Sequence, residues 1–298
     1  MVDYKKEYDQ LINSRTEYSN CLDIIKMLKT NIWQYFTSNN CINDNINQNI
    51  MKPMGLYVAP VYKVHRSKMV NWPLKHGSEI YVDNDFIEEN KEDPKLVMCQ
   101  ITHEAIHGIT RKVDDKNNNY LFGHVNIVNK NGIDYTAINE ACTQIVAEEI
   151  NGIIIEKDVY YSLKTIIRII MLIIGKKEML DQFCNSNTIF EEKFNSITNN
   201  RFNDFAKVME TILNLSKRMR NGKIDSEKQL IENQINNYIK HTLKFIKNAF
   251  NEELIKKPEI YDEFNKIYDG KFTLEELFSK ENILTAKKDS YDNIKYRR

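Results

Sequence analysis

The most specific feature of the sequence is the segment His103-Glu104-Ala105-Ile106-His107, an HExxH pattern. Two histidines four residues apart lie on one face of an α-helix, so both imidazoles can bind the same metal ion. Glu104 flanks that face and can reach a metal-bound water without being a ligand itself. Zinc suits neutral imidazoles and lowers the pKa of its bound water to near neutrality. The pattern therefore predicts one catalytic Zn²⁺ per chain.

A catalytic zinc needs a third protein ligand, for which Glu140 is the candidate. Glu140 lies 33 residues after His107, in Asn139-Glu140-Ala141-Cys142-Thr143 at the start of a second expected helix. Thr143 and Gln144 follow one turn later, where either can give a hydrogen bond to a ligating histidine. The alternative for Glu140 is a solvated carboxylate that the helix dipole favours. With the HExxH upstream, we expect Glu140 to be a ligand.

An HExxH helix followed by an NExxT helix resembles the gluzincin metallopeptidases, and the resemblance is specific from about Ser78 to Ile155. It implies that His103, His107 and Glu140 bind zinc. It also implies that Glu104 is the general base, which takes a proton from the zinc-bound water and passes it to the leaving amine. The implied activity is hydrolysis of a peptide bond.

The resemblance extends to the expected architecture. Gluzincins have a strand beside the active-site cleft, two zinc helices behind it and a helical lobe on the far side. By position, Glu79–Val82 is similar to that edge strand, and the chain after Val159 is similar to the lobe. A zincin-like fold, with a small mixed sheet and an active-site helix, follows as an expectation.

Gluzincins also supply a Tyr, His or Arg that stabilises the oxyanion of the tetrahedral intermediate. Four residues near the expected site are candidates for this role: Tyr135, Tyr160, Tyr161 and His124. Each has an alternative as an aromatic core residue or a hairpin surface residue. Cys99 and Cys142 are expected to be small buried residues rather than zinc ligands, because a catalytic zinc keeps its fourth position open for water.

The elements around the site follow from periodicity and from turn signals. Pro94 opens the HExxH helix after Asp93 as its cap. A polar loop is expected over Lys112–Asn119, and Asn-Gly at Asn131-Gly132 predicts a β-hairpin. Two strands and a second helix are expected at Leu56–Val64, Glu79–Val82 and Ala137–Ile150. Because Pro60 cannot donate to a ladder, the first strand should lie at an edge or break there.

The two ends of the chain have a different character. A helical pattern runs from Asp3 to about Phe36, with apolar positions from Leu22 to Tyr35, and an Asn-rich loop is expected over Thr37–Met51. Beyond Val159 the chain reads as helices with breaks at three Asn-rich points: Asn185–Asn187, Asn199–Asn200 and Asn221–Gly222. We therefore expect a predominantly helical α+β protein, with a mixed unit over 1–155 and a helical lobe over 156–298.

Composition narrows the classes of partner and compartment. Lys+Arg and Asp+Glu are both 42 among 298 residues, so the formal net charge is zero and no global basic field favours nucleic acid. The five cysteines show no CxxC spacing, which favours a reducing compartment without disulfides. The most apolar run, Ile166–Ile174, is far shorter than the roughly 20 residues of a membrane span. A polar N-terminus favours the cytoplasm, although a leaderless exported protein would look the same.

Taken together, these patterns predict a zinc metallopeptidase that acts on a peptide or protein substrate and binds no nucleic acid. They specify no oligomeric state. The alternative is a helical protein-interaction module whose zinc site is structural or vestigial. The presence of Glu104 favours the enzyme, because a purely structural site has no use for that carboxylate.

Overall fold

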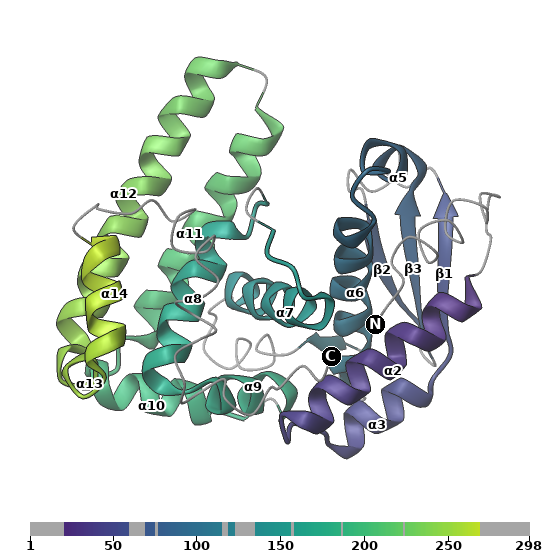
Figure 1. Ribbon diagram of the computed structural model, residues 1–298, viewed down its shortest axis with the longest axis horizontal. Coiled ribbons are helices and arrows are strands. Elements are labelled where there is room, and N and C mark those ends of the chain that lie inside the picture. The colour runs from purple at the N-terminus through teal and green to yellow at the C-terminus, as the bar shows by residue number, and fades with distance from the viewer. Residues whose placement is uncertain are drawn as a thin grey trace. The chain divides into compact units, whose positions relative to one another are not determined.

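A computed structural model of the chain describes residues 21–59, 69–74, 77–114, 119–122, 135–155, 158–185, 187–222 and 224–268. This part of the chain is mostly helical and includes a small mixed sheet (Figure 1), which confirms the predominantly helical α+β class. It divides into two compact units. The first unit holds the described residues up to 122 and residues 143–154, and the second holds 135–142 and 155–268. The domain boundary expected at residue 155 stays a prediction.

The first unit combines helices with short strands. Its elements are α2 (Leu22–Ser38), α3 (Asp44–Met51), β1 (Met54–Ala59), β2 (Met69–Leu74), β3 (Gly77–Asp83), α5 (Asn84–Glu89), α6 (Pro94–Thr110), β4 (Arg111–Asp114) and β5 (Asn119–Phe122). Helix α7 (Thr136–Asn151) is continuous, and its residues from Thr143 onward also belong to this unit.

The three-stranded sheet has the order β1-β3-β2. Strand β3 pairs in parallel with β1, where Leu56 lies opposite Ile80, and antiparallel with β2, where Asn71 lies opposite Ile80. The expectation that Glu79–Val82 is an edge strand was therefore wrong, because these residues lie in the central strand. Its burial agrees with this position, since Ile80 and Val82 are fully buried.

The two edge strands, β1 and β2, differ in how well the sequence predicted them. Strand β1 is an edge strand of the described sheet, as the sequence predicted, and the chain from Pro60 to Lys68 lies outside the described residues. Strand β2, at the opposite edge, was not predicted, because Asn71 and Pro73 are unusual in strands. Proline is tolerated in an edge strand, where the missing N–H need not serve a neighbour.

Helix α3 corrects the loop expected over Thr37–Met51. The side chain of Asn43 caps α3 by accepting the backbone N–H of Ile46 at 2.8 Å. Ile46 and Asn49 are buried, so tertiary packing overrides the low helix propensity of the Asn-rich sequence. In α2, which precedes it, the expected apolar face is buried except for Leu22, which is 65% exposed at the first helical position.

A second sheet, of two strands, overlaps the region expected to be a polar loop, and most of β5 lies beyond the end of that region. Strands β4 and β5 pair antiparallel, with Arg111 opposite Phe122. Part of the expected Lys112–Asn119 loop is therefore strand, because the ladder satisfies its backbone groups. The hairpin predicted at Asn131-Gly132 lies outside the described residues.

The second unit is helical throughout its described part, as the sequence predicted. It contains the first residues of α7 followed by α8 (Tyr161–Ile174), α9 (Lys176–Asn185), α10 (Ile189–Thr198), α11 (Phe202–Asn221), α12 (Asp225–Ala249), α13 (Asn251–Ile255) and α14 (Pro258–Tyr268). The three predicted breaks coincide with helix ends. At the second of them, Asn199 and Asn200 have φ values of 54° and 62°, which asparagine tolerates better than most residues.

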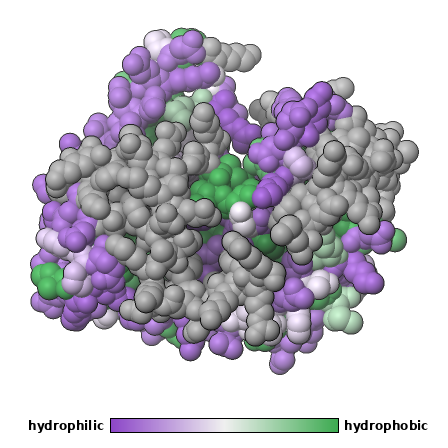
Figure 2. Space-filling model, in the orientation of Figure 1, coloured by the Kyte–Doolittle hydropathy of each residue, from purple (hydrophilic) through white to green (hydrophobic). Residues whose placement is uncertain are grey.

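The core of this unit is aliphatic along α8 and aromatic near α10. The ring centroid of Phe194 lies 5.3 Å from Phe202, 5.0 Å from Phe205 and 5.3 Å from Phe250. Helix α12 turns its isoleucines inward, and the visible surface over α11 and α12 is mostly hydrophilic (Figure 2). No helix of the described residues is both long and apolar enough to cross a membrane. All five cysteines are buried and free of disulfides.

Candidate metal centre

Helix α6 carries both histidines of the HExxH pattern. Its start follows the sequence prediction: Asp93 accepts the backbone N–H of Leu96 at 3.0 Å, and Pro94 occupies the first turn. The helix contacts α2, α3, β2 and β3, and it runs beside the sheet in Figure 1. Between Val97 and Thr110 only Gln100 and Glu104 are half-exposed, so the polar side of the helix is buried as well as the apolar side.

The two imidazoles face one another on successive turns of α6. His103 is 2% exposed and His107 is 9% exposed. Their Nε2 atoms lie 3.0 Å apart, and the ring planes are inclined by 79°. In this orientation, one nitrogen of each buried ring points toward the same position.

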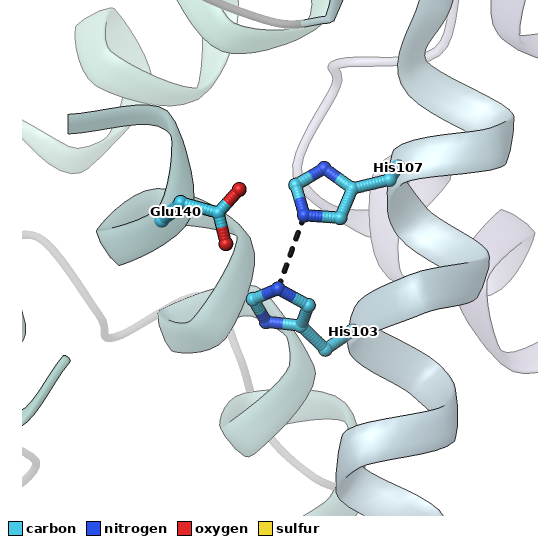
Figure 3. Close-up of side chains that lie close together, drawn as sticks. All are labelled: His103, His107 and Glu140. Carbon is cyan, nitrogen blue, oxygen red and sulfur yellow. Dashed lines mark hydrogen bonds between the residues drawn. The ribbon is translucent and has the colours of Figure 1, made fainter. Parts of the chain in front are cut away.

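Glu140 projects from α7 toward the same point (Figure 3). One nitrogen of each histidine and one carboxylate oxygen of Glu140 all lie within 4.8 Å of one another. Ligand atoms about 2.0–2.2 Å from a tetrahedral zinc are separated by about 3.3–3.6 Å. Small side-chain movements would therefore let the three atoms share one ion. The donor set of two imidazoles and a carboxylate fits zinc with a fourth position left for another ligand.

Contacts from the sheet fix the part of α6 that carries the histidines. The side-chain amide of Asn71, in β2, donates to the backbone oxygen of Glu104 at 2.6 Å. Gly108 permits a close approach, because a Cβ atom there would lie 2.8 Å from Ser78 Oγ and 3.0 Å from Asn71 Nδ2. The turn that holds His107 is thus pressed against the strands.

Helix α3 satisfies the carbonyl groups at the end of α6. The side-chain amide of Asn49 donates to the backbone oxygens of Ile109 at 2.9 Å and Arg111 at 2.7 Å. Asn45 donates to the same oxygen of Arg111 at 3.0 Å. The last carbonyls of a helix lack intrahelical donors, so these asparagines act as a C-terminal cap from another helix.

Polar contacts also join α7 to α6 within the first unit. The amide of Asn151 donates to Thr102 Oγ1 at 3.0 Å and to the backbone oxygen of Ala147 at 2.8 Å. The amide nitrogen of Gln144 lies 3.7 Å from the sulfur of Cys99. No sequence pattern marked Asn49, Asn71 or Asn151, since a single asparagine in an Asn-rich chain carries no signal that it will bond to another element.

Thr143 and Gln144, the predicted hydrogen-bond partners of a ligating histidine, are both fully buried. The amide oxygen of Gln144 has no hydrogen-bond partner among the described residues, whereas its nitrogen faces Cys99. This oxygen is thus a buried acceptor on the same helix as Glu140. The expected role of both residues stays a prediction.

Glu104 is on the ligand helix, half-exposed where its neighbours are buried, and it is not among the three residues whose ligand atoms converge. A carboxylate beside the ligands that remains open to solvent matches what a general base requires. Glu104 precedes His107 by three residues, and residues three apart are neighbours on a helix surface. Helix geometry alone therefore places Glu104 beside His107.

The candidates for oxyanion stabilisation are dispersed. The hydroxyl of Tyr135 donates to Asn203 Oδ1 at 2.8 Å, and burial, followed by the charge of Glu191, raises its pKa to about 12. Tyr160 is half-buried directly before α8, and the ring of half-buried Tyr161 lies 5.9 Å from the amino group of Lys164. His124 lies outside the described residues.

The structure describes one further histidine, and it shows Cys99 and Cys142 as the buried cysteines that the sequence predicted. His241 is exposed on α12, and His65 and His76 lie outside the described residues. Cys99 and Cys142 are fully buried, and burial raises the pKa of the Cys142 thiol, which disfavours the thiolate that metals bind.

No protein-family model, no curated protein and no solved structure matches this chain.

Proposed function

We propose that this protein is a zinc-dependent metallopeptidase of the gluzincin type. The observation that carries the proposal is the convergence of His103, His107 and Glu140 within 4.8 Å, from two helices that 25 intervening residues separate in sequence (111–135). An exposed carboxylate cluster arises often by chance, but this group combines two buried imidazoles with one carboxylate. The donor set is the one that catalytic zinc uses.

His103, His107 and Glu140 would hold the ion. Zinc in such a site supplies a Lewis acid, which polarises a carbonyl oxygen and lowers the pKa of water. The chain supplies the proton transfer: the Glu104 carboxylate accepts a proton from the attacking water and returns it to the leaving amine. The half-exposed position of Glu104 supports this role, since substrate and water must both reach it.

The zincin-like architecture belongs to the same proposal. A small mixed sheet packs against the HExxH helix, and the Glu140 helix is bonded to that helix through Asn151 and Thr102. Strand β2, rather than the central strand β3, is the edge strand in contact with α6, so in this proposal β2 is the strand beside the active-site cleft.

The test couples metal content to cleavage. Purified protein is expected to hold about one zinc per chain by elemental analysis and to cleave members of a random peptide library, read by mass spectrometry. Removal of zinc with a chelator should abolish cleavage, and added zinc should restore it. Cleavage that persists after complete removal of the metal would overturn the proposal. Stoichiometric zinc without cleavage, combined with metal-independent capture of a partner protein, would favour the interaction module instead.

A further inference from the structure

The first turn of α7, which positions Glu140, is capped by a carboxylate from a distant helix. The backbone N–H of Ala137 donates to Glu210 Oε1, a residue of α11 that lies 73 positions later in the chain. The first N–H groups of a helix have no acceptor inside the helix, and they carry a partial positive charge. A carboxylate in this place accepts a charge-assisted hydrogen bond, stronger than one to a neutral acceptor.

The residue before α7 is held by the same helix. Tyr135 is 2% exposed, its hydroxyl donates to Asn203 Oδ1 at 2.8 Å, and its ring lies edge-on to Phe202 with centroids 5.3 Å apart. Asn203 and Glu210 are seven residues apart, which is two turns, so they lie on one face of α11. One face of α11 therefore binds both the entry to α7 and its first turn.

Glu140 follows Ala137 by three residues and lies one turn further along α7. Helix ends open readily when their terminal groups lose their partners. Because bond lengths in a zinc site are confined to within about 0.2 Å, opening of this turn would remove the third ligand. The histidines would be unaffected, since they lie on α6 and are fixed by their own contacts.

We propose that Glu210 is a positioning residue for Glu140, and that the affinity of the metal site depends on this carboxylate of α11. The inference rests on the proposed function of His103, His107 and Glu140 as ligands. It adds a residue that no motif marks: Glu210 acts only through the backbone of α7.

The experiment compares two substitutions at one position. Glu210→Ala removes the hydrogen-bond acceptor, whereas Glu210→Gln keeps an amide oxygen that can accept the Ala137 N–H. Zinc dissociation constants are measured by competition with a chromophoric chelator. We expect Glu210→Ala to weaken zinc binding about 10–100-fold, as substitutions behind metal ligands do, and Glu210→Gln to recover most of the affinity.

Two controls separate positioning from a general loss of stability. Glu232→Ala removes an exposed carboxylate of α12 and should leave zinc affinity unchanged. Ile246→Val trims a fully buried side chain of the same unit, so it should lower the urea midpoint without weakening zinc binding. If Ile246→Val weakens zinc as much as Glu210→Ala at a similar loss of stability, the positioning role is overturned.

The outcomes also distinguish this inference from the metal site on which it rests. If Glu140→Ala loses zinc while Glu210→Ala binds it as tightly as the unmodified protein, the inference is wrong and the metal site stands. If the unmodified protein takes up no zinc, the metal site fails, and hydrogen exchange decides the capping contact. In metal-free protein, Glu210→Ala should then speed exchange of the amides of residues 137–141 at least tenfold, and unchanged exchange there overturns the inference.

Discussion

The Nε2 atoms of His103 and His107 face each other at 3.0 Å, and both rings are buried in the last two turns of α6. A neutral imidazole has one N–H and one lone pair, so two Nε2 atoms form a hydrogen bond only when the rings differ in tautomer. A shared cation instead uses the lone pairs of both rings, and the adjacent carboxylate of Glu140 adds a third donor.

Substitution of a single ligand should remove the metal. His103→Ala, His107→Ala and Glu140→Ala are each expected to reduce bound zinc from about one ion per chain to a small fraction, because a catalytic site has only three protein ligands. Elemental analysis after dialysis measures this. His241→Ala, at an exposed histidine of α12, is the matched control and should keep its zinc. Stoichiometric zinc in Glu140→Ala would exclude Glu140 as a ligand.

Glu104→Gln should separate metal binding from turnover. The amide has nearly the same shape but accepts no proton at neutral pH, so zinc content should persist while kcat falls about 10²–10⁴-fold. A cleavable peptide identified with the unmodified protein provides the assay. Glu92→Gln, an exposed residue just before α6, serves as the control and should cleave normally. Equal rates for Glu104→Gln and the unmodified protein would refute the assigned base.

Gly108→Val tests the close packing of α6 against the sheet. The added side chain would overlap Ser78 Oγ and Asn71 Nδ2, which lie 2.8 Å and 3.0 Å from the position of a Cβ atom. Overpacking of this kind costs about 1–3 kcal/mol, and the displaced turn carries His107. We expect a lower urea midpoint together with weaker zinc binding. Addition of Ser78→Ala should recover part of both, and a fully stable Gly108→Val protein would contradict the packing.

The buried ion pair of the second unit should outweigh an exposed one. Lys164 and Asp158 lie 2.8 Å apart with side chains 2% and 11% exposed, whereas Arg201 and Asp204 are more than half exposed. Asp158→Ala leaves a buried cation short of its partner and should cost about 3 kcal/mol in unfolding free energy. Asp204→Ala should cost less than about 1 kcal/mol. Urea denaturation compares the two, and equal losses would contradict the distinction.

The raised pKa of Tyr135 predicts a pH-dependent contribution to stability. In the folded protein this pKa is about 12, against 10.0 as its ordinary value, so folding favours the protonated hydroxyl. The contribution is complete below pH 10 and is lost as the pH rises from about 10 toward 12. Tyr135→Phe should therefore lose about 1 kcal/mol at pH 9, where the Asn203 hydrogen bond is intact, and less at pH 11. A constant deficit measured by urea unfolding at both values would disprove the shift.

Local patterns in the sequence determined the elements that carry the candidate site. Asp93 and Pro94 fixed the start of α6, and the period of 3.6 residues then set His103 and His107 on one face. Asn-rich breaks marked the helix ends of the second unit. These signals are short-range, so they can be interpreted without knowledge of what the helices contact.

Tertiary structure decided which strand is central. It also stabilised α3, whose Asn-rich sequence alone predicted a loop. Glu79–Val82 was a strand in either case, but only pairing with both β1 and β2 made it the middle one. Nothing in the sequence distinguishes Asn49 and Asn71 from the other asparagines. Their importance comes from the hydrogen bonds that their side-chain amides donate to backbone oxygens of α6. Strand order and buried amide contacts join residues far apart in the chain, and such pairings leave no local periodicity.

For the candidate metal site, the sequence determined that His103, His107 and Glu104 lie close together, because one helix turn relates them. The nearness of Glu140 depends on α7 being bonded to α6 by Asn151, and its first turn is capped by Glu210. That capping contact spans 73 residues, and its donor is a backbone N–H that every residue except proline possesses. A contact of this kind is encoded by the packing of helices, so only the folded chain reveals it.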